Sequence, residues 1–211
     1  MKKLRFVVTA GPTREHLDPV RFLSNPSTGK MGFAVARAAA ARGHEVALVA
    51  GPVALRTPKG VRRVDVVSAR EMDAAVRREL GDGRGCVLVA VAAVADWRPA
   101  KCAAKKLKKG QMSGVLRLVR NPDILKSARA QVKVGFAAET GDAVPEARRK
   151  CREKGLGMIV ANDVTEKGAG FGTDTNRVVF LRADGTRESL PLMSKLAVAG
   201  RIVRECEGFC A

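Results

Sequence analysis

The first fifty residues alternate between apolar runs and one alanine-rich segment, and this alternation constrains the fold more than any other feature of the sequence. The apolar runs at residues 4–9 and 45–50 are typical of buried parallel strands. Between them, residues 24–41 begin with small polar residues and glycine and continue as a strong helix former. A strand, a glycine-bearing loop, a helix and a second strand predict a βαβ unit, whose two strands are parallel.

The rest of the chain continues this alternation. Further strands are expected at residues 64–67, 86–94, 115–119, 132–138 and 157–161, and further helices at 68–80, 121–130, 144–154 and 194–206. Asp184-Gly185, between residues 177–181 and 188–192, predicts a hairpin. The sequence therefore indicates one α/β domain, residues 1–211, with an open, doubly wound, mainly parallel sheet and a β-hairpin near its C-terminal end.

Several residues mark the ends of the expected helices. Ser68-Ala-Arg-Glu71 forms a capping box, and Gly43 suits the position after the first helix. Asn121-Pro122-Asp123 predicts an N-cap at Asn121 with proline in the first helical position. Residues 10–19, which precede the first helix, are expected to form a loop.

The start of the first helix is a candidate anion site. A helix that opens on Ser27, Thr28, Gly29 and Gly32 presents free backbone N–H groups and the positive end of its dipole. Gly29 and Gly32 would let the backbone approach a ligand closely. The motif is neither Gly-x-Gly-x-x-Gly nor a P-loop, so an ordinary capped helix is the alternative.

Ligands of doubly wound sheets bind beyond the carboxyl ends of the strands. This rule selects residues 9–13, Gly51-Pro52 and residues 93–98 as one crevice. Asp96 follows the most apolar strand of the chain, at that crevice. It is either a functional carboxylate or a residue that only caps or turns the chain.

The charge of the chain favours an anionic ligand. Its formal net charge is +18 and its pI about 10.5, whereas aromatic residues are only 4% and tyrosine is absent, which disfavours binding of single-stranded nucleic acid. Five lysines lie in residues 101–110, which form either a solvated loop or a lid that closes on a polyanion. Lys150 and Lys154, four residues apart, either bind an anion together or complement a helix C-terminus.

No feature of the sequence indicates export or membrane insertion. Met1-Lys-Lys leads directly into a strand, and no apolar run approaches the length of a membrane span, so a cytoplasmic protein is expected. The five cysteines are expected to be reduced thiols. Cys206 and Cys210 could share a helix face, but no histidine lies near them to complete a metal site.

Eight segments, in register along nearly the whole chain, resemble those of phosphopantothenoylcysteine synthetases, the ligases of coenzyme A synthesis. The segments are residues 9–15, 17–21, 24–32, 92–96, 106–109, 121–123, 135–140 and 161–164. The resemblance implies a Rossmann-like fold, a homodimer and a requirement for Mg²⁺, carried mainly by the triphosphate. It also implies a two-step reaction, in which 4′-phosphopantothenate is activated by CTP to an acyl cytidylate and L-cysteine then displaces CMP. Many relatives carry a flavin-dependent decarboxylase in front of this domain, so such a decarboxylase is a candidate partner.

The same resemblance assigns roles to individual residues. Asn25 matches a residue that contacts the acyl group, Arg21 a substrate-site arginine, and Lys106 a lysine needed for the first step and for nucleotide binding. Ala93 matches a substrate-binding position, and Ser27, Gly29 and Lys30 are expected to bind substrate with it. The expected nucleotide-binding residues are Ala90, Val91, Ala92, Asp96, Pro122, Asp123, Ile124, Leu125, Phe136, Lys150 and Lys154. In one departure, the segment after Lys109 is short and glycine-bearing (Gly110-Gln-Met-Ser-Gly114), so the lid is expected to differ in length from those of relatives.

Two other classes of function compete with the ligase. An NAD(P)-linked oxidoreductase shares the fold class, but the chain lacks Gly-x-Gly-x-x-Gly after the first strand and has Gly51-Pro52 where an acid for the ribose would stand. A nucleic-acid-binding module would explain the net charge but not an anion loop, Asp96 and Lys106 around one crevice. We therefore expect no nucleic-acid or membrane partner.

Overall fold

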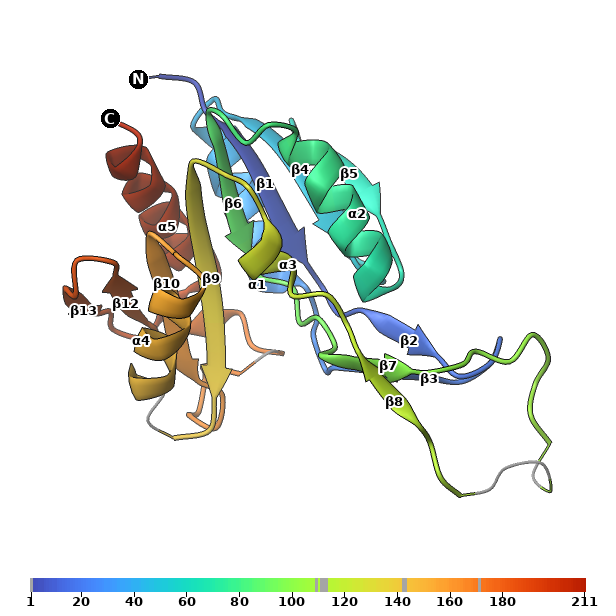
Figure 1. Ribbon diagram of the computed structural model, residues 1–211. Coiled ribbons are helices and arrows are strands. Elements are labelled where there is room, and N and C mark those ends of the chain that lie inside the picture. The colour runs from blue at the N-terminus through green and yellow to red at the C-terminus, as the bar shows by residue number, and fades with distance from the viewer. Residues whose placement is uncertain (1, 109, 111–113, 142–143, 171) are drawn as a thin grey trace.

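The computed structural model describes residues 2–108, 110, 114–141, 144–170 and 172–211. In this part of the chain an eight-stranded sheet forms the centre, in the order β13-β12-β10-β9-β6-β1-β4-β5 (Figure 1). Its strands are β1 (Arg5–Ala10), β4 (Glu45–Ala50), β5 (Arg62–Asp65), β6 (Cys86–Ala90), β9 (Val132–Glu139), β10 (Met158–Asp163), β12 (Val179–Arg182) and β13 (Arg187–Ser189).

Six of these strands are parallel and run in the order β5-β4-β1-β6-β9-β10. Numbered along the chain, this is the 3-2-1-4-5-6 order of Rossmann folds, so the predicted doubly wound sheet is confirmed. The strand order reverses between β1 and β6, and a ligand crevice is expected at that point. β12 and β13 extend the sheet as an antiparallel hairpin at one edge.

Helices cover both faces of the sheet, which explains why its central strands are apolar on both sides. Helices α1 (Lys30–Ala41) and α5 (Lys195–Phe209) pack together on one face (Figure 1). The other face carries α2 (Ala69–Leu80), α3 (Ile124–Ser127) and α4 (Val144–Glu153). Helices therefore lie on both faces of the sheet beside the crevice between β1 and β6.

The predicted helix signals are largely confirmed. Oγ of Ser68 accepts a hydrogen bond from the N–H of Glu71 at 3.2 Å, and Gly43 follows α1 with φ 84°. Ser194 caps α5, which continues to Phe209, beyond its predicted end at Cys206.

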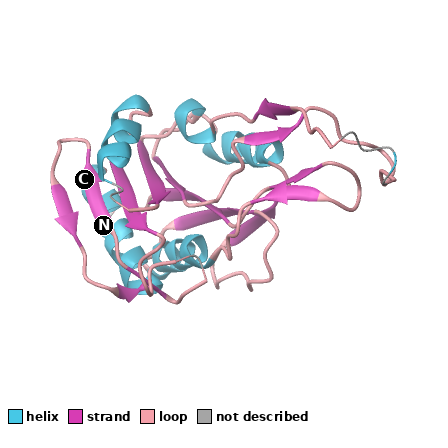
Figure 2. Ribbon diagram, turned by 90° about the horizontal axis from the view of Figure 1, so that it is seen from below, coloured by secondary structure: helices cyan, strands magenta, loops and turns pink. Residues whose placement is uncertain are grey.

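The pairing of three two-stranded ribbons was not predicted, and of their six strands only β8 was expected, because strands of two or three residues are too short to show periodicity. They are β2 (Arg14–His16) with β3 (Phe22–Ser24), β7 (Trp97–Pro99) with β8 (Leu118–Arg120), and β11 (Thr175–Asn176) with β14 (Met193–Ser194). The first two ribbons and the described parts of their connecting loops, residues 14–24, 97–108, 110 and 114–120, form what we call the arm. Figures 1 and 2 show the arm projecting at the end of the molecule opposite the two termini.

Two strand predictions are wrong at their ends. The strand predicted at residues 64–67 is β5, which lies two residues earlier, and the strand predicted at 115–119 is β8, which begins at Leu118. The long apolar run at 86–94 forms a strand only to Ala90. The residues after Ala90 turn toward β1, since the N–H of Ala93 donates to Gly11 O at 2.9 Å and Pro12 and Ala93 form an isolated bridge.

Helix α3 is shorter than predicted and has a different cap. The side chain of Asn121 does not cap it, because Nδ2 donates to Ala95 O at 2.8 Å. Asp123 caps the helix instead, accepting from the N–H of Lys126 at 3.0 Å. The chain leaves the helix at Ala128 in an extended conformation, and the N–H of Gln131 bonds to Gly83 O and Cys86 O, which leads the chain into β9.

Candidate functional site

Two buried threonine hydroxyls join the ends of β1 and β6. Oγ1 of Thr9 accepts hydrogen bonds from the N–H groups of Val91 and Ala92, both at 3.1 Å. Oγ1 of Thr13 accepts one from the N–H of Ala95 at 3.0 Å. These bonds fix the backbone of the segment after β6, which lines the crevice.

Two cavities open at this crevice and share Ala92 and Phe136. The α1 cavity, at the N-terminus of α1, has a volume of about 340 Å³ and contains eight predicted site residues: Asn25, Ser27, Gly29, Lys30, Val91, Ala92, Ala93 and Phe136. The α3 cavity, at the start of α3, has a volume of about 490 Å³ and contains nine: Ala90, Ala92, Asp96, Pro122, Asp123, Ile124, Leu125, Phe136 and Lys154. Both volumes suit small molecules, and two bound molecules would meet at the shared wall.

The N-terminus of α1 suits an anion. The helix follows Gly29, whose φ is 77° and which has no side chain that could cap it. The N–H groups of its first turn and the positive end of its dipole lie at this cavity. The positive charge that Lys30 brings to this cavity is partly neutralised, because its Nζ lies 2.7 Å from Oδ1 of Asp174.

The structure gives a different reason for glycine at position 32 than the close approach of a ligand expected from the sequence. A Cβ at this position would lie 2.6 Å from Cβ of Ala10 and 2.8 Å from O of Thr9. The missing side chain thus lets α1 pack directly on β1, although Gly32 also lines the α1 cavity. Helix packing, and not only approach to a ligand, requires glycine here.

Asn25 lies at the rim of the α1 cavity, and its amide is already engaged. Nδ2 donates to the carbonyl oxygens of Ala93 and Val94, both at 3.2 Å. The side chain therefore connects the loop before α1 with the segment after β6.

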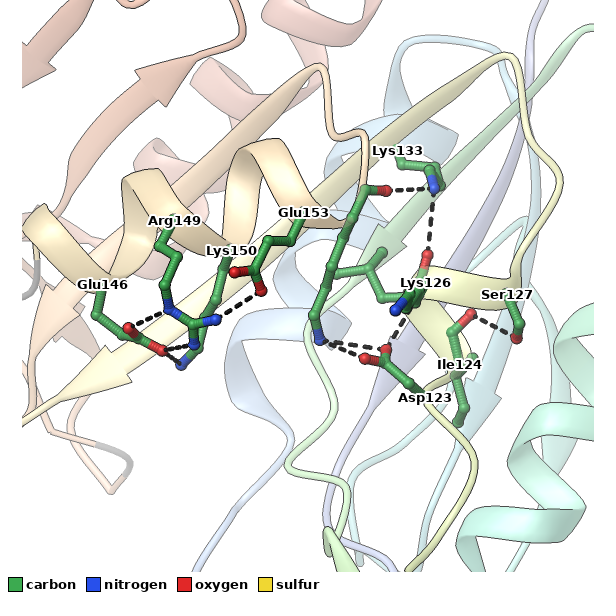
Figure 3. Close-up of polar contacts among 11 residues, drawn as sticks. Asp123, Ile124, Lys126, Ser127, Lys133, Glu146, Arg149, Lys150 and Glu153 are labelled. Carbon is green, nitrogen blue, oxygen red and sulfur yellow. Dashed lines mark hydrogen bonds and ion pairs between the residues drawn. The ribbon is translucent and has the colours of Figure 1, made fainter.

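The start of α3 and the end of α4 meet through an ion pair in the α3 cavity. Nζ of Lys154 lies 2.9 Å from Oδ2 of Asp123, the N-cap of α3 (Figure 3). Burial opposes ionisation of Asp123, but the hydrogen bonds from Lys154 and from the N–H of Lys126 outweigh it, so the pKa of Asp123 is lowered. Asp96 is exposed at the mouth of this cavity.

Lys150 does not line either cavity. Its Nζ lies 2.7 Å from Oε1 of Glu139. It also lies 3.5 Å from Oε1 of Glu146 (Figure 3). The predicted repulsion between Lys150 and Lys154 is therefore relieved without a ligand, because each lysine has a carboxylate of its own.

Arg21 lies on the arm and outside both cavities. Its Nε donates to Oδ2 of the buried Asp18 at 3.0 Å, and its Nη2 donates to O of Leu107 at 2.8 Å. Oδ2 of Asp18 also accepts from the N–H of Leu107 at 3.2 Å. Asp18 and Arg21 thus hold the lysine-rich loop by its backbone, and we call this arrangement the latch.

The latch persists in acid. The side-chain hydrogen bonds from Arg21, reinforced by backbone N–H groups, hold the pKa of Asp18 far below its usual value of 3.8, even though burial opposes this shift. A carboxyl group whose folded pKa is lowered stabilises the fold fully above its unfolded pKa and loses that contribution only as pH falls through the folded value. The latch is therefore intact throughout the neutral range.

Lys106 is exposed on this loop and lies outside the lining of both cavities. The structure brings together the other candidate residues of the crevice but leaves Lys106, Arg21 and Lys150 apart from it. Lys109 and residues 111–113, on which the expected difference in lid length partly depends, lie outside the described residues.

The α1 cavity also contains residues that were not predicted as site residues. Asn162, Ala169, Gly170, Asn176 and Lys195 form its outer wall. Asn162 belongs to a segment already noted for its resemblance, so that resemblance was a usable signal. No sequence signal pointed to Asn176 or Lys195, because only the fold brings the β11–β14 ribbon to α1.

The residues that the structure describes include no group of three or more His, Cys, Asp and Glu that could hold a metal ion. Asp96 and Asp123 both line the α3 cavity, so carboxylates are available beside a metal that a triphosphate carries. None of the described helices is both long and apolar enough to cross a membrane.

Comparison with known proteins identifies the family. The model of the DNA/pantothenate metabolism flavoprotein C-terminal domain matches residues 1–209. This chain belongs to that family. Within it, the coenzyme A biosynthesis bifunctional protein CoaBC of Vibrio cholerae is 48% identical over 206 residues, covering 94% of this chain and 51% of the relative. CoaBC of Bacillus subtilis is 48% identical over 204 residues, covering 94% and 50%. The chain thus spans about half the length of these relatives.

Solved structures agree with the family assignment. The crystal structure of the C-terminal domain of CoaBC has a TM-score of 0.82 at 42% identity, and the match covers 100% of this chain and 98% of that one. A Cab2 mutant H337A in complex with phosphopantothenate-cysteine has a TM-score of 0.78 at 15% identity and covers 98% and 87%, which supports the fold alone. The resemblance noted from the sequence motifs and the Rossmann-like fold are both confirmed.

Proposed function

We propose that this protein is a phosphopantothenate–cysteine ligase that activates 4′-phosphopantothenate with CTP and then couples it to L-cysteine. The observation that carries this proposal is the pair of cavities that share Ala92 and Phe136. A ligase of this kind must bring a carboxylate to an α-phosphate, and two adjoining sites with a common wall provide that geometry. Membership of a family that includes the coenzyme A biosynthesis protein of Vibrio cholerae supports the same conclusion.

In the proposed reaction, phosphopantothenate occupies the α1 cavity and the nucleotide occupies the α3 cavity. Ser27, Gly29, Lys30 and the first-turn N–H groups of α1 bind an anionic group of the substrate. Asp96, the start of α3 and Lys154 bind the nucleotide. Mg²⁺, when bound with the triphosphate, neutralises the charge of its phosphate oxygens. Asn25 and the backbone of Ala93 hold the acyl group at the shared wall.

Pyrophosphate release provides the direct test. The protein, mixed with CTP and Mg²⁺, is expected to release pyrophosphate only when 4′-phosphopantothenate is added, and to form CMP and the cysteine amide when cysteine follows. ATP in place of CTP measures the nucleotide preference. A thermal-shift panel of CTP, NADH and a DNA duplex separates the alternatives: stabilisation by NADH or DNA, without CTP-dependent pyrophosphate release, would contradict the ligase.

Replacing Asn25 by Asp is expected to impair transfer to cysteine. In the reaction, Nδ2 would exchange one of its bonds to the carbonyl oxygens of Ala93 and Val94 for a bond to the acyl oxygen. A carboxylate can donate to none of these oxygens and would repel all three. By analogy with oxyanion donors, the loss is about 3 kcal/mol of transition-state stabilisation. Single-turnover kinetics with preformed acyl cytidylate measures this step, and equilibrium binding of CTP should remain unchanged. Asn25→Ala is the control that removes the donor without adding charge. Wild-type transfer in Asn25→Asp would exclude the role.

Lys150 and Lys154 should respond differently to replacement by Gln. Lys154 lines the α3 cavity, so Lys154→Gln should raise the Michaelis constant for CTP and weaken its dependence on salt. Lys150→Gln, four residues away and paired with Glu139, is the matched control and should have the smaller effect. Both folds should survive, because partly exposed ion pairs contribute little to stability. Equal effects of the two variants would contradict a specific contact by Lys154.

We also propose that the protein forms a homodimer through the arm. Most of the large apolar side chains that are exposed in the described part of the chain lie there: Val20, Phe22, Trp97, Val115, Leu116 and Leu118. Such a patch on a projecting ribbon is typical of a protein interface, and a second copy of the chain offers the same patch for self-complementary pairing. The relatives are bifunctional proteins, so a flavin-dependent decarboxylase, fused or separate, is a further proposed partner.

Light scattering coupled to gel filtration tests the dimer. Leu118→Lys, in the middle of the arm, is expected to yield a folded monomer, because a buried unpaired charge is costly at an interface. Leu196→Lys, on α5, introduces the same change at an equally exposed position away from the arm and should leave the mass unchanged. A dimeric Leu118→Lys would show that the arm is not the interface.

A further inference from the structure

The outer wall of the α1 cavity contains a polar atom that the protein itself leaves without a partner. Asn176 lines this cavity and is only 4% exposed. Its Oδ1 is buried and has no hydrogen-bond partner in the described part of the chain. Buried acceptors in native structures are almost always paired, so an unpaired one in a cavity points to a donor on the ligand.

The backbone holds Asn176 in this orientation. Asn176 pairs with Met193 in the β11–β14 ribbon, and the N–H of Lys195 donates to Asp174 O at 2.9 Å. The side chain of the preceding Thr175 donates to Gly168 O at 2.7 Å. Since successive side chains of a strand point to opposite faces, this contact directs Asn176 to the other face, toward the cavity.

Two ammonium groups fix the loop before β11. Nζ of Lys30, from α1, donates to Gly172 O at 3.0 Å and lies 2.7 Å from Oδ1 of Asp174. Nζ of Lys195, from the start of α5, donates to Gly170 O at 3.1 Å and to Thr173 O at 2.5 Å. Contacts from two helices on one short loop keep this wall in place before any ligand binds, which is the preorganisation that a recognition site requires.

We propose that Oδ1 of Asn176 accepts a hydrogen bond from the amide N–H of the pantothenate moiety, which makes Asn176 a specificity-determining residue of the proposed phosphopantothenate site. This inference rests on the proposed function. The phosphate and the carboxylate of that substrate are acceptors at neutral pH and would repel Oδ1. Its amide N–H is a neutral donor, which is what an unpaired carbonyl oxygen requires.

The surroundings of Asn176 suit the rest of the same moiety. Met31, Val91, Phe136, Ala138 and Ala169 line the α1 cavity and offer apolar contacts. The carbon bearing two methyl groups, which the hydroxyl-bearing carbon separates from the amide in pantothenate, is the apolar part of an otherwise polar molecule. The apolar walls and the one directed acceptor fit this arrangement of groups, and they distinguish the cavity from a general anion site.

The test compares two substrates on two enzymes. Wild type and Asn176→Leu are each assayed for CTP-dependent pyrophosphate release with 4′-phosphopantothenate and with its ester analogue, in which oxygen replaces the amide N–H. Wild type is expected to lose about 10- to 100-fold in kcat/KM on the ester, because Oδ1 then has no donor. Asn176→Leu is expected to be weakened by a similar factor on the natural substrate and to show no further loss on the ester.

Further measurements make the assignment specific. Asn176→Asp keeps acceptor oxygens and should again discriminate against the ester. An analogue lacking the secondary hydroxyl should be affected equally in wild type and Asn176→Leu, because that hydroxyl is not the proposed donor. The Michaelis constant for CTP should not change in either variant.

The outcomes separate this inference from the function on which it rests. If wild type releases no pyrophosphate with the natural substrate, the proposed function is wrong and the inference fails with it. If wild type is active and does not discriminate against the ester, the inference alone is wrong, and this result needs no variant. An equal ester penalty in wild type and Asn176→Leu, or a hydroxyl penalty that depends on Asn176, would likewise overturn the assignment.

Discussion

Lys106→Gln is expected to abolish formation of the acyl cytidylate, so that no pyrophosphate appears whether or not cysteine is present. In the proposed reaction the first step joins two anions, so a cation would be needed at the α-phosphate as the new P–O bond forms. Mg²⁺, when bound with the triphosphate, would neutralise phosphate charge, and a lysine ammonium could act at the α-phosphate as a mobile point charge. Loss of such a charge should cost at least about 100-fold in the rate of the first step.

The controls for this prediction are the neighbouring lysines. Lys105 is exposed like Lys106, and Lys105→Gln, Lys108→Gln and Lys109→Gln should be milder because they change only the general field. Circular dichroism and thermal unfolding of Lys106→Gln should match the wild type, since an exposed lysine contributes little to stability. Equal losses in all four variants would assign the loop a purely electrostatic role and would refute the special role of Lys106.

Gly51→Ala is expected to have the largest effect on stability. Gly51 directly follows β4, beside the loop that follows β1, and a Cβ there would lie 1.7 Å from O of Pro12. Because this contact is with backbone, the loop at the crevice must move, at a cost of about 3 kcal/mol. For a chain of this size that corresponds to a fall in Tm of roughly 6–12 °C.

Gly200→Ala provides a matched control with the opposite sign. Gly200 lies inside α5, and a Cβ there would approach only the Arg204 guanidinium, at 3.9 Å. Alanine should stabilise this helix by up to about 1 kcal/mol, because glycine has the lower helix propensity. Differential scanning calorimetry of both variants measures the contrast. An unchanged Tm for Gly51→Ala would show that the loop yields without cost.

The main sheet could be predicted because its elements are long enough to show their period. Residues 4–9 and 45–50 are continuous apolar runs, and Ser68 and Glu71 mark the start of α2 with two complementary side chains. The hairpin β12–β13 was predicted by its turn, although the ends of its strands are displaced by one to three residues.

The unpredicted features depend on contacts between distant segments. Asn121 has the composition of a helix cap, but Ala95, which the fold places beside it, takes its side chain. Gly32 is glycine because β1 lies directly beneath it. Local sequence shows neither contact. The motifs therefore selected the correct part of the chain, but they predicted the wrong role for Asn121 and an incomplete one for Gly32.

The latch makes the β2–β3 ribbon and the lysine loop, both parts of the arm, one mechanical unit. Oδ2 of Asp18 and the Arg21 guanidinium are bonded to the backbone of Leu107, the residue next to Lys106. Any association that orders the arm would therefore also restrict the loop. Thermodynamic linkage requires the converse by the same factor: a nucleotide that orders the loop would tighten the association. Subunit assembly and nucleotide affinity would then be two measurements of one coupling free energy, and Asp18 and Arg21 are the residues through which it would act.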